Sequence, residues 1–294
     1  MKPTIQWMAM SCILLAGVIA CTKIKANETE TKSLKGAVVA MGEGTLETFG
    51  EIDKDGNPLK IGVSFSKEAL DSPPTTLSDG NRCFDHDNSG SIDTDTECMP
   101  WHERVIPLPA TITRNVDMPF KWALVNWNLE GHIPDGIWNE PHFDVHFYIA
   151  PIEKIFGLQR GDCGPEFLRC DQYEIATKPV PDHLMHPDYI NVGAAAPAMG
   201  NHLVDTTAAE FSGTPFTRSW IYGVYDAEVI FYEEMLAQSY MQTLPNDCFP
   251  IKTTPEVALS GYYPETVCTR HDESSGGVAV SLEDFVYRTA SNGS

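Results

Sequence analysis

Histidines and carboxylates recur in this chain at spacings that suit a first-row metal ion. Nine His are present, and the run His142-Phe143-Asp144-Val145-His146 alternates polar and apolar residues. On a β-strand, its two His and its Asp share one face. His142 and His146 would lie ~13 Å apart on a regular strand, so they cannot both bind one ion directly. Either one lies ~6.6 Å from Asp144, which is close enough for a shared site.

We therefore expect a zinc-like site, for Zn²⁺ or another first-row metal, with Asp144 orienting one of the ligands. The expected ligands are His142, His146, His202 and Glu233, with His132 nearby. These residues are scattered along the chain, so an alternative stays open. In that alternative the histidines only form hydrogen bonds inside a polar-lined sheet. The pattern assigns no catalytic residue.

A second candidate ion site is an aspartate-rich loop. Its residues follow the spacing of an EF-hand calcium loop, with Gly90 at the sixth place. The expected oxygen ligands are Asp85, Asp87, Ser89, Ser91, Asp93 and Glu97. The twelfth place holds Thr96 instead of a bidentate Glu, and Glu97 comes one residue late. No amphipathic helix flanks the loop, so we expect a structural Ca²⁺ and no helix-opening sensor. The alternative is a solvated acidic turn without an ion.

The cysteines favour an oxidising compartment. Eight are present, of which Cys12 lies in the N-terminal apolar segment and Cys21 directly after it. The other six fall as three near neighbours. Sequence alone allows 15 connectivities for six cysteines, and proximity favours three bridges. They are Cys83–Cys98, Cys163–Cys170 and Cys248–Cys268.

The N-terminus has the pattern of an export signal. Its apolar run, Trp7–Ala20, is too short for a membrane span, which needs ~20 residues. Val18-Ile19-Ala20-Cys21 resembles a lipobox, which implies cleavage after residue 20 and lipidation of Cys21. Thr22, in place of an Asp, follows Cys21, and by resemblance to Gram-negative lipoproteins this favours sorting to the outer membrane of the cell envelope. Residues 21–34 are polar and predict a flexible tether. Ordinary secretory cleavage, without a lipid, is the alternative.

The charge balance limits the classes of partner. Twenty Lys and Arg face 41 Asp and Glu, which gives a net charge of -21. Such a chain repels phosphate backbones, so nucleic acid is excluded as a partner. The expected membrane contact is the lipid anchor.

Strand-like segments dominate the rest of the chain. β-branched and aromatic residues predict strands over 38–41, 46–49, 61–65, 120–129, 143–149, 220–224 and 229–232. Residues 233–242 predict a helix. No alternation of strands and helices is visible, so we expect an antiparallel β-sandwich or barrel with a few short helices. We expect one domain over 35–290, with residues 77–99 as an insertion.

Several motifs together resemble a family of uncharacterised bacterial secreted proteins and lipoproteins. They are Gly131-His132 with Pro134, the segment Pro141–Tyr148, and Met199–Asp205. The family includes a Thermus protein regulated by an extracytoplasmic (sigma-E) factor. The resemblance implies one largely β domain, a homo-oligomer as one option, and His motifs lining a common pocket. It brings no established activity.

The sequence favours a non-catalytic envelope lipoprotein, a calcium-stabilised β-rich domain with a binding or stress-related role. The alternative is a metal-dependent hydrolase or oxidoreductase that uses the cluster of His142, His146, His202 and Glu233. The two differ in whether these side chains meet in an open pocket.

Overall fold

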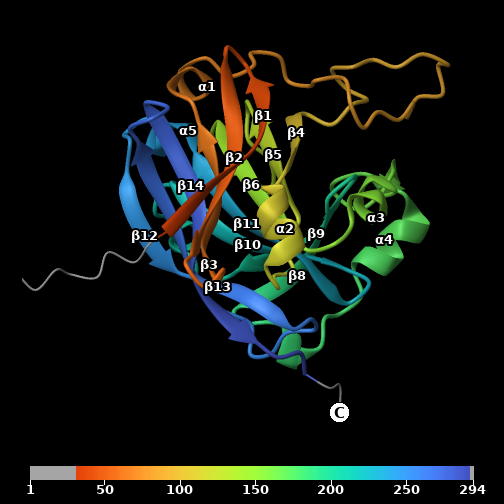
Figure 1. Cartoon of the computed structure of the whole chain (residues 1–294). Coiled ribbons are helices and arrows are strands. Elements are labelled where there is room, and N and C mark those ends of the chain that lie inside the picture. Colours follow the sequence, from red (N-terminus) through yellow and green to blue (C-terminus); the bar gives the residue numbers. More distant parts are fainter. Residues whose placement is uncertain (1–30, 292–294) are drawn as a thin grey trace, which may run out of the picture.

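Two antiparallel sheets pack face to face in the computed structural model, which describes residues 31–291 (Figure 1). The smaller sheet has six strands in the order β1-β2-β3-β14-β13-β12. The larger has seven in the order β4-β5-β6-β11-β10-β9-β8. Both sheets are open, so of the two expected architectures the sandwich is correct and the closed barrel is not.

The strands of the smaller sheet are β1 (Thr31–Met41), β2 (Gly44–Asp53), β3 (Pro58–Phe65), β12 (Asn246–Pro250), β13 (Gly261–Asp272) and β14 (Gly277–Arg288). Those of the larger sheet are β4 (His102–Pro107), β5 (Trp122–Asn128), β6 (His142–Tyr148), β8 (Tyr189–Ala196), β9 (Gly200–Asp205), β10 (Arg218–Tyr225) and β11 (Glu228–Ala237). A short strand, β7 (Arg160–Cys163), lies outside both sheets.

The helices are all short. They are α1 (Lys67–Asp71), α2 (Ala110–Asn115), α3 (Ile152–Phe156), α4 (Cys170–Ala176) and α5 (Gln238–Met241), with 3-10 turns at Asp182–Leu184 and Ala209–Ser212. Among residues 31–291 no helix has the length and apolar character that crossing a membrane requires.

The main core lies between the two sheets and uses one face of each strand. In β6 that face carries Phe143, Val145 and Phe147, all fully buried. The Phe143 ring lies 5.1 Å from the Phe65 ring of the opposite sheet. The expected alternation of β6 is therefore confirmed, and its other face, with His142, Asp144 and His146, points away from the sandwich core.

The outer face of the larger sheet is also covered. A second apolar cluster packs there, formed by residues of β5, β6, β10 and β11 together with loop residues such as Trp101, Trp138 and Phe216. Loops between the strands thus cover this face of the larger sheet. Polar side chains on the outer face are buried beneath these loops.

The expected helix over residues 233–242 is wrong for its first half. Residues Glu233–Ala237 belong to strand β11, and only Gln238–Met241 is helical. Glu, Met, Leu and Ala favour helices intrinsically. Pairing overrides that preference here, because β11 lies between β6 and β10 and is buried on both faces, which removes the alternation typical of strands.

The expected tether also needs correction at its end. Residues 31–34 form the start of β1 and pair with residues 50–53 of β2. Main-chain hydrogen bonds build this ladder, so polar side chains do not prevent it. The expected signal peptide, Cys21 and the rest of the tether lie outside the described residues.

All three expected cysteine pairs lie at disulfide-bonding distance, namely Cys83–Cys98, Cys163–Cys170 and Cys248–Cys268. The first closes the loop between α1 and β4, which Figure 1 shows extending away from the sheets as a long orange segment. The third joins directly paired residues of β12 and β13.

Candidate metal centre

Two clusters of His and carboxylate side chains lie on the outer face of the larger sheet. His146, His202 and Glu233 form one, with a ligand atom of each within 4.8 Å of the others. His132, His142 and Asp144 form the other, by the same measure. We call them the inner site and the outer site. The expected single set of His142, His146, His202 and Glu233 is thus divided, and His142 belongs with His132.

The inner site is assembled by strand pairing. Glu233 of β11 lies directly opposite His146 of β6, and His202 of β9 lies opposite Gly223 of β10. Gly223 has no side chain, and the Phe231 ring fills the space that a Cβ would need. That ring lies 4.9 Å from the His146 ring and 5.1 Å from the His202 ring. The missing side chain at position 223 therefore lets Phe231 support both imidazoles.

Backbone carbonyls fix the orientation of both inner imidazoles. His146 Nδ1 lies 3.1 Å from the carbonyl oxygen of Leu124, and His202 Nδ1 lies 2.9 Å from that of Ala194. A carbonyl only accepts, so each Nδ1 carries the proton and donates. Each neutral ring then turns the lone pair of its Nε2 toward Glu233. In this tautomer Nε2 can bind a metal while Nδ1–H donates to a carbonyl, as in many metal-ligating histidines.

No hydrogen bond joins the imidazoles of the inner site to Glu233. His146 Nε2 lies 3.5 Å from Glu233 Oε1, and His202 Nε2 lies 3.7 Å from Glu233 Oε2. Both distances exceed those of ordinary hydrogen bonds. His146 Nε2 and Glu233 Oε2 are buried and have no hydrogen-bond partner. Ligands about 2.1 Å from a tetrahedral ion would be about 3.4 Å apart, close to these separations.

Burial keeps the inner imidazoles neutral. Loss of solvent lowers the pKa of His146 to about 3 and that of His202 to about 4. The same loss of solvent, helped by the charge of Asp144, raises the pKa of Glu233 well above its usual range. Neutral imidazole is the metal-binding form of histidine. A cation beside Glu233 would lower the pKa of this carboxyl and so favour the carboxylate form, which is the form that binds a metal.

The outer site differs in its protonation. Burial lowers the pKa of His132, but the hydrogen bond and charge of Asp144 outweigh it and raise that pKa to about 9. The Asp144 carboxyl is held well below its usual pKa by His142 and His132, against the opposing effect of burial. Without a metal, His132 and Asp144 thus form an ion pair.

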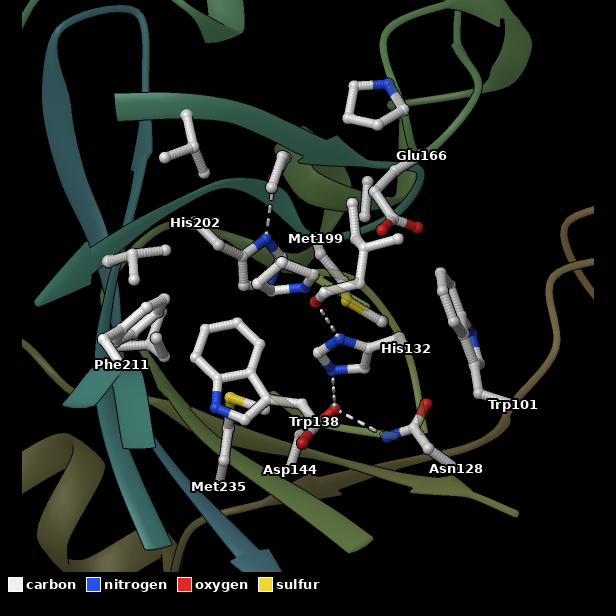
Figure 2. Close-up of a pocket in the computed structure, with 18 residues that line it drawn as sticks. Trp101, Asn128, His132, Trp138, Asp144, Glu166, Met199, His202, Phe211 and Met235 are labelled. Carbon is white, nitrogen blue, oxygen red and sulfur yellow. Dashed lines mark hydrogen bonds and ion pairs between the residues drawn. The ribbon is translucent and has the colours of Figure 1, made fainter. Parts of the chain in front are cut away.

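An apolar pocket of about 400 Å³ opens beside both sites. His132, Asp144 and His202 reach its lining, whereas His142, His146 and Glu233 do not. Figure 2 shows Asp144 between His132 and Asn128, with dashed lines to both. The walls are mainly apolar side chains, among them Trp101, Trp138, Met199, Phe211 and Met235.

Sequence reasoning missed part of this pocket. Trp138 lies between His132 and His142, and Asn128 is the last residue of β5, four positions before His132. Their signal in the sequence is this proximity to the His motifs. Trp101 follows Cys98, and Glu166 lies between Cys163 and Cys170. Neither is near a His motif in the sequence, so nothing there indicated a place in the pocket. Burial raises the pKa of Glu166 at the pocket wall.

The aspartate-rich loop brings three of its expected ligands together. Carboxylate oxygens of Asp85, Asp87 and Glu97 lie within 4.8 Å of one another. The other expected ligands, Ser89, Ser91 and Asp93, line an adjoining surface hollow together with Asp87 and Glu97. Backbone N–H groups of the same loop already donate to these carboxylates, for example Gly90 to Asp85 at 2.9 Å and His86 to Glu97 at 2.7 Å.

No protein-family model, curated protein or solved structure matches this chain. The resemblance to secreted bacterial proteins stays a prediction.

Proposed function

We propose that this protein is an exported metal-binding domain that holds one first-row divalent ion, zinc-like, at the inner site. The observation that carries the proposal is the pair of unpartnered polar atoms, His146 Nε2 and Glu233 Oε2, buried beside His202 Nε2. Leaving buried polar atoms unpaired costs roughly 1–3 kcal/mol each. A cation bound between them removes that cost.

Two imidazoles and one carboxylate also match the donor set of metal centres that keep an open position. Three protein ligands leave a fourth position of a tetrahedral ion for water or another molecule. His202 lies on the pocket wall, with 17% of its side chain exposed, so this position has a route to the pocket.

The pocket also supports a second candidate function, a metal-dependent hydrolase or oxidoreductase. In that case the ion would activate water or bind a substrate in the apolar chamber. Of the two roles we favour binding, because His146 and Glu233 are buried and do not reach the pocket lining.

We further propose that Ca²⁺ stabilises the loop closed by Cys83 and Cys98, and that a lipid on Cys21 holds the domain at the outer membrane. The first rests on the converging carboxylates of Asp85, Asp87 and Glu97. The second rests on the N-terminal sequence pattern alone.

The direct test is a zinc titration of untagged protein after chelator treatment, in millimolar calcium to fill the loop. Glu233→Gln keeps the size of the side chain but removes its charge, and we expect zinc affinity at the inner site to fall more than 100-fold. Glu228→Gln, on an exposed end of the same strand, is the matched control and should bind as the wild type does. A wild-type protein that takes up no zinc would refute the proposal.

A further inference from the structure

We propose that the outer site, formed by His132, His142 and Asp144, is a second metal site. It would take a first-row divalent ion, and its open coordination position would face the pocket. This inference goes beyond the proposed function, because none of these residues belongs to the inner site.

The separations within the outer site suit a shared ion. Asp144 presents one oxygen to each imidazole: Oδ1 lies 3.2 Å from His142 Nε2, and Oδ2 lies 3.5 Å from His132 Nε2. The two imidazole rings are 4.7 Å apart, centre to centre. Ligands about 2.1 Å from a tetrahedral ion would be about 3.4 Å apart, close to these separations. One ligand atom of each residue also lies within 4.8 Å of the other two.

Both outer imidazoles are anchored by Nδ1. His132 Nδ1 lies 2.8 Å from the carbonyl oxygen of Ile133, and His142 Nδ1 lies 2.7 Å from that of Glu140. Nδ1 therefore donates in both rings, and each Nε2 is turned toward Asp144. His142 Nε2 and Asp144 Oδ1 are buried without a hydrogen-bond partner. His142 is fully buried and Asp144 is 4% exposed, so water does not easily satisfy these atoms.

Neighbouring groups hold the outer ligands in place. Asn128 donates from Nδ2 to Asp144 Oδ2 at 2.7 Å, which fixes the carboxylate as partners of metal ligands often do. The loop that carries His132 is closed by the hydrogen bond from His132 N–H to the Trp138 carbonyl, at 3.2 Å. Gly131 permits this closure, since its φ is +72° and a Cβ there would lie 2.0 Å from the Trp138 carbonyl oxygen.

The two sites are separate but adjacent. Asp144 and His146 are two residues apart on β6, which places their Cα atoms ~6.6 Å apart on the same face. Met235 lies opposite Asp144 and Glu233 lies opposite His146. Each carboxylate therefore lies beside two imidazoles of its own site: Asp144 beside His132 and His142, and Glu233 beside His146 and His202.

The outer site is the more open of the two. His132 and Asp144 both line the pocket, and 24% of the His132 side chain is exposed. An ion held by the three ligands would keep a position directed at a chamber walled by Trp101 and Trp138. The indole N–H groups of both Trp are buried and unpartnered. That position suits water or the donor atom of a small, mainly apolar molecule.

The test is cobalt binding by the full, untagged chain after chelator treatment, in millimolar calcium, with stoichiometry and the visible spectrum of bound Co²⁺ as readouts. We expect two equivalents in the wild type. Asp144→Asn should lose one of them and keep the other, while Glu233→Gln should lose the complementary one, so that the two variant spectra add up to that of the wild type.

His132→Gln, at a partly exposed loop position, is the second variant in case Asp144→Asn fails to fold, and it should also lose one equivalent. His271→Ala, an exposed histidine of β13, is the control and should keep both. If Asp144→Asn and His132→Gln bind as much cobalt as the wild type with the same spectrum, the second site is refuted even where the inner site stands. If Glu233→Gln changes nothing while Asp144→Asn loses an equivalent, the inner site fails and this one stands.

Discussion

The aspartate-rich loop and the inner histidine site are both candidate ion sites, but they are built in opposite ways. The loop takes Asp85, Asp87 and Glu97 from one short segment and exposes most of its length to solvent. The inner site takes His146, His202 and Glu233 from three strands, with His146 and Glu233 buried and His202 at the pocket wall.

Their internal hydrogen bonding differs as well. In the loop, the Ser89 N–H donates to Asp85 and Asp87 at 3.0 and 2.9 Å, and the Asp93 N–H donates to Glu97 at 2.9 Å. In the inner site, His146 Nε2 and Glu233 Oε2 are buried without a hydrogen-bond partner. The loop can therefore hold its shape without an ion, whereas two buried polar atoms of the strand site lack a hydrogen-bond partner. We expect metal binding to matter more for stability at the strands than at the loop.

The largest expected effect is zinc stabilisation of the folded protein. An ion that binds only the folded state at 1,000 times its Kd adds about 4 kcal/mol to the free energy of unfolding. We expect a gain of this size for each occupied site in urea unfolding of the wild type with excess zinc, in the presence of calcium. The combined variant Glu233→Gln with Asp144→Asn should show almost none. An equal gain in that variant would mean that zinc binds elsewhere.

Removing the disulfide of the loop should have the next largest effect. Cys83 and Cys98 are 15 residues apart in the sequence. Replacing both by Ser opens that loop in the unfolded chain, which should lower the free energy of unfolding by about 3 kcal/mol. Chemical unfolding of the double variant under non-reducing conditions measures this loss. Zinc affinity at the strands should stay unchanged, and a large drop there would break the separation between the two regions.

Calcium should stabilise the protein more modestly. At 10 times its Kd, an ion adds about 1.4 kcal/mol, so millimolar Ca²⁺ should raise the melting temperature by a few degrees. Asp85→Ala with Asp87→Ala should remove the increment. Asp95→Ala, in the same loop but outside the three converging carboxylates, is the control and should keep it. The loop carries no calcium if the wild type fails to respond.

The smallest effect is the pH dependence that His146 contributes to the metal-free protein. Burial holds the pKa of His146 at about 3 in the folded state, against 6.5 in the unfolded chain. Unfolding therefore takes up a proton below pH 6.5, and stability falls as the pH falls. This histidine should contribute a loss of about 1 kcal/mol from pH 6.5 to about pH 5.5.

The measurement is the slope of unfolding free energy against pH, in chelator, for the wild type and His146→Gln. The variant should have the flatter slope over that range. Equal slopes would show that His146 is not desolvated as the structure indicates.

The sequence predicted the parts of the molecule whose signals are local. The alternation of residues 142–148 identified β6 and the face that carries its histidines, and neighbouring cysteines identified the three pairs. The spacing of Asp85 and Asp87 located the loop carboxylates that converge with Glu97. Each of these depends on residues within about 20 positions of one another, where spacing constrains geometry.

Features that depend on pairing between strands far apart in the chain could not be predicted from the sequence. The register of β11 against β6 decides that Glu233 faces His146 and that Glu234 turns to the other side, where it pairs with Arg218. The same register turns residues 233–237 into a strand despite their helix-favouring composition. The division of the histidines into two sites follows from this register and from the closure of the loop at Gly131.

The most direct test of the account is anomalous X-ray diffraction at the zinc edge from crystals of the untagged protein grown with zinc. We expect a peak within bonding distance, about 2.0–2.2 Å, of His146 Nε2, His202 Nε2 and a Glu233 carboxylate oxygen. A well-ordered inner site without such a peak, while zinc is bound elsewhere in the crystal, would contradict it.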